Sequence, residues 1–186
     1  MNQAVFFDRD GTLIEEKEFL HRPEDVVWIP GVGVALQRLQ KAGFLLFIVS
    51  NQSGVGRGYF SMADVESVNK RMEQELAAFG ICFQKIYIAP EKPGSPSLGR
   101  KPLPRFLFDA RDEFGLDLSR SYMIGDKLSD LQCGWSAGVK KSILVRTGYG
   151  LETEKEISNT MASNPEQPII VESLPEAVDW ILSRSV

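Results

Sequence analysis

The chain has 186 residues, 43% of them hydrophobic and 25% charged, with a formal net charge of -4 and a pI near 5.2. This length and composition predict one globular domain over residues 1–186 with a buried core. The acidic balance argues against nucleic acid as a partner, and no apolar run reaches the roughly 18 residues that a membrane span needs. We therefore expect a soluble protein with neither kind of partner. We also expect a monomer, although the sequence itself does not determine the oligomeric state.

Neither the N-terminus nor the cysteines carry an export or metal signal. Charged residues at positions 8–10 interrupt the first apolar stretch before it could act as a secretory signal, so a cytoplasmic location is expected. Cys82 and Cys133 lie far apart without a zinc-binding spacing, and both are expected to be buried as small apolar side chains.

The first part of the chain predicts two strands separated by a helix. Residues 4–7 form an apolar run that is too short for a helix and typical of a buried parallel strand. A helical pattern begins after Pro30 and ends at Gly43, and a second strand is expected at residues 44–49. The apolar face of the helix is expected to consist of Val34, Leu36, Leu39 and Ala42.

A long helix and a third strand follow. Ser61 and Asp64 have the spacing of a helix-capping arrangement, and the helical pattern that they open runs to Gly80. Residues 83–89 predict a strand, whereas residues 90–104 hold five prolines and two glycines and predict a stiff loop. The apolar face of the helix is expected to consist of Val65, Val68, Met72, Leu76 and Phe79.

Strands and helices keep alternating in the C-terminal half. Residues 151–167 are polar and weakly patterned, and the sequence assigns them neither an element nor a role. A closing helix begins at Ser173 and Pro175. The other expected elements are helices at residues 106–114 and 128–137, and strands at 122–124, 142–145 and 169–171.

This order of elements predicts an α/β fold, with a doubly wound, mostly parallel sheet. The spacing between motifs leaves no room for a large cap domain. Ligands of such sheets bind at the carboxyl ends of the strands. Four polar clusters follow predicted strand ends, namely DRDGTLI from Asp8, SNQSGVGRG from Ser50, RKP from Arg100 and GDKLSD from Gly125.

The first cluster places two carboxylates, Asp8 and Asp10, where a strand meets a glycine turn. An aspartate can attack phosphorus and form an acyl phosphate if Mg2+ and cations neutralise its charge, so Asp8 is the candidate nucleophile. Asp10 can protonate a leaving alkoxide and later activate water. The alternative is an ordinary polar turn, because Asp and Gly are common turn residues.

Polar residues of the second and third clusters are suited to binding phosphate. Ser50 can donate a hydrogen bond to a phosphate oxygen, and Lys101 can place an ammonium group there. Arg57 and Arg100 offer guanidinium groups that suit a second anionic group on a ligand. For Arg100 and Lys101 the alternative is a solvated basic pair beside a proline loop.

The fourth cluster adds two carboxylates after the strand predicted at residues 122–124. Asp126 can supply a third oxygen ligand for a cation, and Asp130 can support that ligand from behind. A helix-capping role is the alternative for Asp130.

Taken in order, these motifs resemble the haloacid dehalogenase superfamily of phosphohydrolases, and the fold expected is the Rossmann-like one of that family. The order is Asp-x-Asp-Gly-Thr from Asp8, Ser50 after the second strand, Lys101 after a loop, and Gly-Asp-x-x-x-Asp ending at Asp130. DRDGTLI, SNQSGVGRGYF, GRKP, YMIGDKLSD and VRTG resemble more narrowly the heptose-bisphosphate phosphatase and histidinol-phosphatase group, over about residues 4–148.

The resemblance implies a Mg2+-dependent phosphomonoester hydrolase with an aspartyl-phosphate intermediate, acting on a small phosphorylated metabolite. D-glycero-D-manno-heptose 1,7-bisphosphate, hydrolysed at its 7-phosphate, is the expected substrate. A histidinol-phosphatase or another sugar-phosphate phosphatase is the alternative enzyme, and a phosphate-binding scaffold of the same fold is the alternative outside enzymes.

The resemblance also implies roles for individual residues. Mg2+ would be held by the Asp8 carboxylate, the Asp10 carbonyl and Asp126, with Asp130 behind them. The phosphate contacts would come from Ser50, Asn51 and Lys101, and the substrate contacts from Glu16, Phe19, Gln52, Ser53, Arg57, Arg100 and Lys127.

Two departures from the family pattern change what is expected. Residues 16–19, Glu-Lys-Glu-Phe, replace a sugar-recognising Asp-His-Gly-Tyr pattern, which leaves the exact sugar and its anomer open. His21 beyond them is expected to be a surface residue, although it could face the substrate. No structural zinc is expected, because the positions of the family's Cys and His ligands hold Ala89, Glu91, Ser97 and Gly99.

Overall fold

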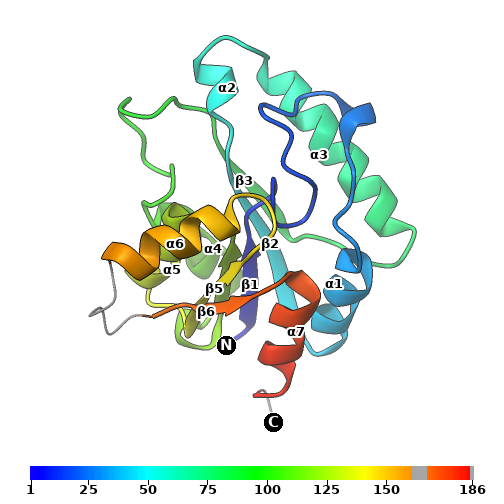
Figure 1. The fold of residues 1–186 in the computed structure, drawn as a ribbon. Coiled ribbons are helices and arrows are strands. Elements are labelled where there is room, and N and C mark those ends of the chain that lie inside the picture. The colour runs from blue at the N-terminus through cyan, green and yellow to red at the C-terminus, as the bar shows by residue number, and fades with distance from the viewer. Residues whose placement is uncertain (161–166, 185–186) are drawn as a thin grey trace.

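The computed structural model describes residues 1–160 and 167–184, which form a sheet of six parallel strands covered by helices (Figure 1). The strand order is β3-β2-β1-β4-β5-β6. The predicted α/β, doubly wound class is confirmed. The strands are β1 (Gln3–Phe7), β2 (Phe44–Asn51), β3 (Lys85–Ala89), β4 (Tyr122–Gly125), β5 (Lys141–Val145) and β6 (Ile169–Val171).

Helices cover both faces of the sheet because alternate strand residues point to opposite sides. Val5 and Phe7 of β1 pack with the helices α1, α3 and α7, while Ala4 and Phe6 pack with α4 and α5. The helices are α1 (Val32–Lys41), α2 (Ser53–Gly56), α3 (Met62–Ala77), α4 (Arg105–Phe114), α5 (Leu128–Ala137), α6 (Gly150–Thr160) and α7 (Leu174–Leu182), with short 3-10 turns η1 (Pro23–Asp25) and η2 (Leu118–Arg120).

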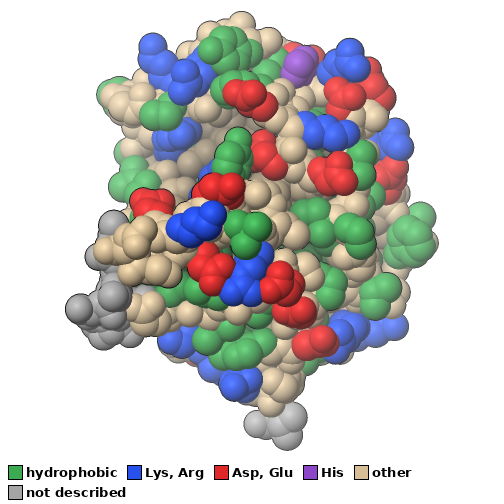
Figure 2. Space-filling model, viewed as in Figure 1, with side chains coloured by type: hydrophobic (Ala, Val, Ile, Leu, Met, Phe, Trp, Pro, Cys, Tyr) green, Lys and Arg blue, Asp and Glu red, His purple; other side chains and the backbone are tan. Residues whose placement is uncertain are grey.

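The connections between the strands consist of single helices, 3-10 turns and loops, and the described residues include no large cap domain. None of their helices is long and apolar enough to cross a membrane. On the face shown in Figure 2, acidic and basic side chains are interspersed.

The capping arrangement predicted for α3 is confirmed. Ser61 N donates to Asp64 Oδ2 at 2.8 Å, and Asp64 N donates back to Ser61 Oγ at 3.3 Å. Both partners of the box therefore satisfy backbone groups that the first helical turn leaves open.

Three residues predicted on apolar helix faces are exposed instead. Val34 is 67% exposed, because the buried face of α1 is formed by Val32, Ala35, Leu36 and Leu39. Ala42 and Phe79 lie beyond the last helical residues of α1 and α3, where the helical period no longer sets the direction of a side chain. Phe79 is also 67% exposed.

The two cysteines have different environments. Cys133 is buried in α5, as predicted, but Cys82 is exposed. Cys82 lies between Ile81 and Phe83, whose side chains are buried, and in this extended stretch its own side chain faces outward.

Helix α6 occupies part of the segment in which no element was predicted. Apart from Gly150, the buried positions among the described side chains of α6 are Thr153 and Ile157. The helix therefore has a narrow apolar stripe that the polar sequence obscures. Residues 161–166 of that segment lie outside the described residues. The short α2 was also not predicted, since it lies within a glycine-rich run.

The strand order reverses between β1 and β4, which lie side by side at the centre of the sheet. At such a point the connections leave the two strands toward opposite faces, and a crevice opens at their carboxyl ends. Asp8 directly follows β1 and Asp126 directly follows β4. The topology thus places both of these carboxylates at the crevice.

Candidate active site

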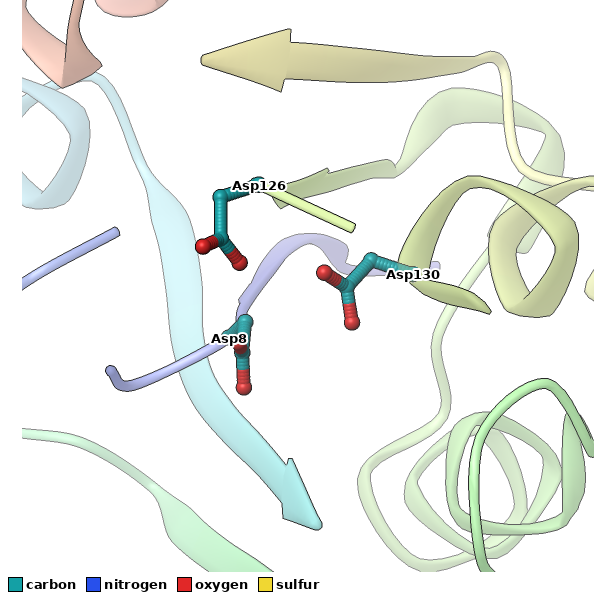
Figure 3. Close-up of side chains that lie close together, drawn as sticks. All are labelled: Asp8, Asp126 and Asp130. Atoms are coloured by element: carbon teal, nitrogen blue, oxygen red, sulfur yellow. The ribbon is translucent and has the colours of Figure 1, made fainter. Parts of the chain in front are cut away.

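Three carboxylates converge at the carboxyl ends of β1 and β4, and Figure 3 shows that the three side chains lie close together. Asp8, Asp126 and Asp130 each place one oxygen within 4.8 Å of an oxygen of the other two. They are only 5%, 0% and 0% exposed. Such a group of buried negative charges requires positive charge nearby.

Lys101 supplies part of that positive charge. Its Nζ lies 2.7 Å from Asp8 Oδ1 and 2.6 Å from Asp130 Oδ1. Burial favours the neutral amine, but attraction to Asp130 and Asp8 outweighs it and raises the pKa of Lys101. Burial likewise favours a neutral Asp8, but Lys101 and Lys127 prevail and lower its pKa. Asp8 is therefore an anion held beside a cation.

Asn51 holds the backbone of Lys101 in place. Its Oδ1 accepts from Lys101 N at 3.0 Å, and its Nδ2 donates to Lys101 O at 3.1 Å. These paired bonds join the end of β2 to a residue of the proline-rich loop. The loop therefore delivers the Lys101 ammonium to the end of β1.

Asp126 is the carboxylate best placed to bind a metal ion. Its Oδ2 accepts from Tyr149 N at 2.8 Å, whereas its buried Oδ1 has no hydrogen-bond partner among the described residues. Burial, followed by repulsion from Asp8 and Asp130, raises the pKa of Asp126 to about 8. A hard cation with oxygen ligands, such as Mg2+, would satisfy this oxygen and stabilise the ionised form.

Asp130 forms an ion pair through one oxygen and accepts a hydrogen bond through the other. Oδ1 pairs with Lys101, and Oδ2 accepts from Lys127 N at 2.9 Å, which closes a capping arrangement at the start of α5. Its pKa is raised, mainly by burial. Asp130 thus caps a helix, which was the alternative considered for it from the sequence, and also pairs with Lys101, whereas its support of a metal ligand remains a prediction.

Two glycines allow the loops around Asp126 to close on each other. Gly11 has a φ of 82° and Gly148 a φ of 56°, in the left-handed region that favours glycine. A Cβ on Gly148 would overlap Asp126 Oδ2 and lie 2.6 Å from Gly11 Cα. Thr147 Oγ1 donates to Gly11 O at 2.6 Å and fastens the loops together.

Asp10 is held by a different set of contacts. Arg9 donates to both of its carboxylate oxygens, Nε to Oδ2 at 3.0 Å and Nη2 to Oδ1 at 3.2 Å. Gln52 Nε2 donates to Asp10 Oδ2 at 2.9 Å and to Ser50 Oγ at 2.8 Å. Gln52 therefore connects the carboxylate that follows β1 with the hydroxyl at the end of β2.

A cavity of about 250 Å³ opens above these groups. Asp126 does not line it and lies beneath, beside Asp8. Leu20, Ser129 and Tyr149 also line it and were not singled out from the sequence, and so do Glu18 and Gly54, which were noted in the sequence but not predicted as site residues. The predicted residues that line it are Asp8, Asp10, Glu16, Phe19, Ser50, Asn51, Gln52, Ser53, Lys101, Lys127 and Asp130.

Arg57 and Arg100 are not among the residues that line this cavity. Arg100 Nη1 donates to Glu91 O at 2.8 Å, and Arg100 N donates to Ser97 Oγ at 3.0 Å. Burial lowers the pKa of Arg100, and Arg57 lies close enough to lower it further. The two guanidinium groups therefore form a basic pair outside the cavity, and hydrogen bonds order the loop that carries Arg100.

Within residues 16–21, the side chains that line the cavity are Glu16, Glu18, Phe19 and Leu20. Glu16 pairs with Lys127 at 3.1 Å, and the Lys127 ammonium lies 4.5 Å from the centre of the Tyr149 ring. Phe19 meets Tyr59 edge to face at 4.9 Å and has a φ of 61°, which is rare for a bulky side chain. His21 is half-buried, stacks on Phe60 and does not line the cavity.

Similarity to known proteins identifies the family. A family model described as HAD-hydrolase-like matches residues 98–177. A Haemophilus ducreyi protein named D-glycero-beta-D-manno-heptose-1,7-bisphosphate 7-phosphatase is 40% identical over 161 residues, covering 83% of this chain and 88% of its own. The chain belongs to the haloacid dehalogenase superfamily of phosphatases.

Other relatives match the phosphatase over nearly its full length. A D-glycero-D-manno-heptose-1,7-bisphosphate 7-phosphatase of Thermosynechococcus vestitus is 40% identical, over 97% of this chain and 96% of its own. The solved D,D-heptose 1,7-bisphosphate phosphatase from B. bronchiseptica, complexed with magnesium and phosphate, superposes with a TM-score of 0.88 at 29% identity, covering 97% and 98% of the two chains. The predicted family and the predicted enzyme class are confirmed.

Proposed function

We propose that this phosphatase hydrolyses phosphomonoesters through an aspartyl-phosphate on Asp8, with Mg2+ as cofactor. The observation that carries the proposal is the buried Asp8 carboxylate, paired with Lys101 at the base of a cavity. Mg2+ would be held by Asp8, the Asp10 carbonyl and Asp126, whose free buried oxygen suits it. When bound, it would neutralise charge that develops on the transferring phosphoryl group.

In the first step Asp8 attacks phosphorus, so that an Asp8–phosphorus bond forms while the bond from phosphorus to the leaving oxygen breaks. Lys101, together with Ser50 and Asn51, binds the oxygens of the phosphoryl group. Asp10 gives a proton to the leaving alkoxide. Asp10 then takes a proton from water that attacks phosphorus, which releases phosphate and restores Asp8.

For the substrate, we propose D-glycero-D-manno-heptose 1,7-bisphosphate, cleaved at the 7-phosphate. Support comes from the names of the relatives and from the pair Arg57 and Arg100, which suits a second phosphate that extends out of the cavity. Substrate contacts would also come from Glu16, Phe19, Gln52, Ser53 and Lys127, all of which line the cavity.

A histidinol-phosphatase activity is the second candidate. Glu16 and Glu18 line the cavity and could attract a substrate that carries a cation at the end away from its phosphate. Glu16 and Glu18 therefore favour histidinol phosphate, whereas Arg57 and Arg100 favour the heptose bisphosphate.

Steady-state kinetics with Mg2+ on the heptose bisphosphate, a sugar monophosphate and histidinol phosphate will decide between them. We expect kcat/KM to fall in that order, by about ten- to a hundredfold when the second phosphate is missing. Arg100→Ala should flatten the preference without abolishing hydrolysis of p-nitrophenyl phosphate. A wild-type enzyme fastest on histidinol phosphate would contradict the substrate, and one inactive on every phosphate ester would indicate a binding scaffold.

We further propose that residues 1–186 form one catalytic domain without structural zinc. Glu91 and Ser97 stand at two positions where relatives of this group carry zinc ligands. Here Ser97 Oγ donates a hydrogen bond to Glu91 Oε2 at 3.1 Å. This bond, with those from Arg100, supports the loop without a metal ion. Elemental analysis of purified protein should find no stoichiometric zinc, and one zinc per chain would contradict the proposal.

A further inference from the structure

Arg9, which lies between the two aspartates of the first motif, is one of the largest fully buried side chains among the described residues, with an exposure of 0%. Its guanidinium group donates hydrogen bonds from Nε and Nη2 to the two oxygens of the Asp10 carboxylate. Bidentate pairing of this kind fixes the plane of the carboxylate as well as its position. The side chain of Asp10, at 15% exposure, is the more open of the two.

Two further contacts hold the guanidinium group, one from helix α3 and one from the loop at Leu20. Nη1 donates to Asn69 Oδ1 of α3 at 3.0 Å, and Nη2 donates to Leu20 O at 3.4 Å. A guanidinium group has only donors, so the oxygen of Asn69 must face it. Asn69 is 7% exposed and does not line the cavity. Arg9 thus connects Asp10 to α3, a helix whose residues do not line the cavity.

The contacts of Asp10 distinguish its two oxygens. Oδ2 accepts from Arg9 Nε and Gln52 Nε2, whereas Oδ1 accepts from Arg9 Nη2 alone among the described contacts. Each carboxylate oxygen has about two acceptor sites, so Oδ1 retains room for a proton. The arrangement of donors therefore leaves one defined oxygen available for proton transfer.

We propose that Arg9 is a positioning residue that aims Asp10 Oδ1 at the leaving oxygen of the substrate, and that Asn69 fixes the guanidinium group in that pose. The inference rests on the acid and base role proposed for Asp10. It also connects the site to the segment beside the cavity, because Arg9 Nη2 binds both Asp10 and the carbonyl of Leu20, a residue of the cavity lining.

The competing explanation is a structural one, in which Arg9 serves only as a buried counter-charge. Loss of such a group would reduce activity on all substrates alike. Loss of a positioning group should instead matter most where the leaving group needs a proton, because a strongly acidic phenol leaves unaided. The dependence of rate on leaving-group basicity therefore separates the two explanations.

The experiment compares phenyl phosphate, 4-nitrophenyl phosphate and 2,4-dinitrophenyl phosphate, with saturating Mg2+, as substrates of the wild type and of five variants. Arg9→Met and Asn69→Leu test the inference, Asn69→Asp should rescue because it restores an acceptor, and Asp10→Ala provides the reference. Gln74→Leu, an exposed change on the same helix, is the control for effects on α3.

We expect Arg9→Met to lose at least about tenfold more kcat on phenyl phosphate than on 2,4-dinitrophenyl phosphate, with a smaller loss of the same kind in Asn69→Leu. Equal losses on all three esters would overturn the inference. If Arg9→Met does not fold, Asn69→Leu decides by the same comparison, because it removes one bond outside the cavity. If Asp10→Ala loses kcat equally on all three esters, the acid role of Asp10 itself is refuted. If Asp10→Ala loses more kcat on phenyl phosphate than on 2,4-dinitrophenyl phosphate but Arg9→Met and Asn69→Leu do not, only the role of Arg9 is refuted.

Discussion

The base and the mouth of the cavity differ in how their side chains are held. The base consists of Asp8, Lys101, Asp126 and Asp130, all at most 5% exposed and paired through charge or placed within 4.8 Å of one another. The mouth consists of Glu16, Glu18, Phe19 and Tyr149, of which Phe19 is 36% and Tyr149 is 43% exposed.

This difference indicates where each property of the enzyme resides. Charges in a buried, preorganised site interact strongly and need little reorganisation during the reaction, which suits phosphoryl transfer. Exposed aromatic and acidic side chains can change without disturbing the sheet, which suits selection among substrates. Changes at the base should therefore affect every phosphate ester, and changes at the mouth only some.

The largest effect should come from Lys101→Met. We expect kcat on p-nitrophenyl phosphate to fall about a thousandfold, because Asp8 and the transferred phosphoryl group lose their nearest buried cation. Two buried carboxylates would also lose their counter-charge, so the free energy of unfolding should fall by about 3–5 kcal/mol.

Chemical unfolding and steady-state kinetics at neutral pH measure both effects. Lys85→Met is the matched control, since Lys85 forms an exposed pair with Glu113 and should change stability by less than about 1 kcal/mol. Equal stability of the two variants would contradict the importance assigned to burial at the base.

Gly148→Ala should disturb the base of the cavity through the backbone. The new Cβ would overlap Asp126 Oδ2, so the loops must part, and we expect kcat to fall about a hundredfold. Crowding and the left-handed backbone together should lower the free energy of unfolding by about 2–4 kcal/mol.

Gly43→Ala separates these two causes. Gly43 also has a positive φ, of 88°, but a Cβ there would meet nothing within 4 Å. It should lose about 1 kcal/mol of stability and no activity. Similar losses of activity in both alanine variants would show that the approach of Gly148 to Asp126 is unimportant.

Asp126 should make the stability of the metal-free protein depend on pH. Its pKa is raised to about 8, so in the window from about pH 4 to about pH 8 the folded protein keeps a proton that the unfolded chain has released. The free energy of unfolding should therefore fall as pH rises through this window, and Asp126→Asn should remove that part of the fall.

Chemical unfolding curves in chelator at about pH 5 and about pH 8 measure this change in the free energy of unfolding. We expect Asp126→Asn to be more stable than wild type at the higher pH by on the order of 2 kcal/mol. Mg2+ should restore stability to wild type at the higher pH and not to the variant. If the free energy of unfolding of the wild type rises with pH relative to that of Asp126→Asn, the raised pKa of Asp126 is wrong.

The smallest effect should come from Phe19→Ala at the mouth. Loss of the edge-to-face contact with Tyr59, worth about 0.5–1.5 kcal/mol, should raise KM for the sugar phosphate about two- to tenfold. The kcat on p-nitrophenyl phosphate should stay within about twofold of wild type. Val34→Ala, an exposed change on α1, should alter neither constant, and a large loss of kcat in Phe19→Ala would remove the distinction between base and mouth.

Much of the base could be predicted from the sequence because parallel strands bring their carboxyl ends together. Asp8 and Asp126 follow apolar runs, and this alone places them at one edge of a sheet. The capping box of Ser61 and Asp64 is similarly local, since its partners are three residues apart. Short-range chemistry and topology are therefore visible in a single sequence.

Contacts between distant polar residues could not be predicted in this way. Arg9 and Asn69 are 60 residues apart, and Asn69 lies within an otherwise ordinary helical pattern. Tyr149 and its contact with Lys127 depend on a loop that closes only because Gly148 meets Gly11. Such contacts arise from packing, which composition and period do not describe.

Trapping the phosphorylated enzyme during turnover tests most directly whether Asp8 is the nucleophile. Wild type mixed with Mg2+ and p-nitrophenyl phosphate, quenched rapidly in acid and digested, should yield one phosphorylated peptide whose acyl phosphate on Asp8 is cleaved by hydroxylamine. Asp8→Asn should show neither the adduct nor turnover. Phosphate trapped on another residue, or near-normal turnover in Asp8→Asn, would contradict nucleophilic attack by Asp8.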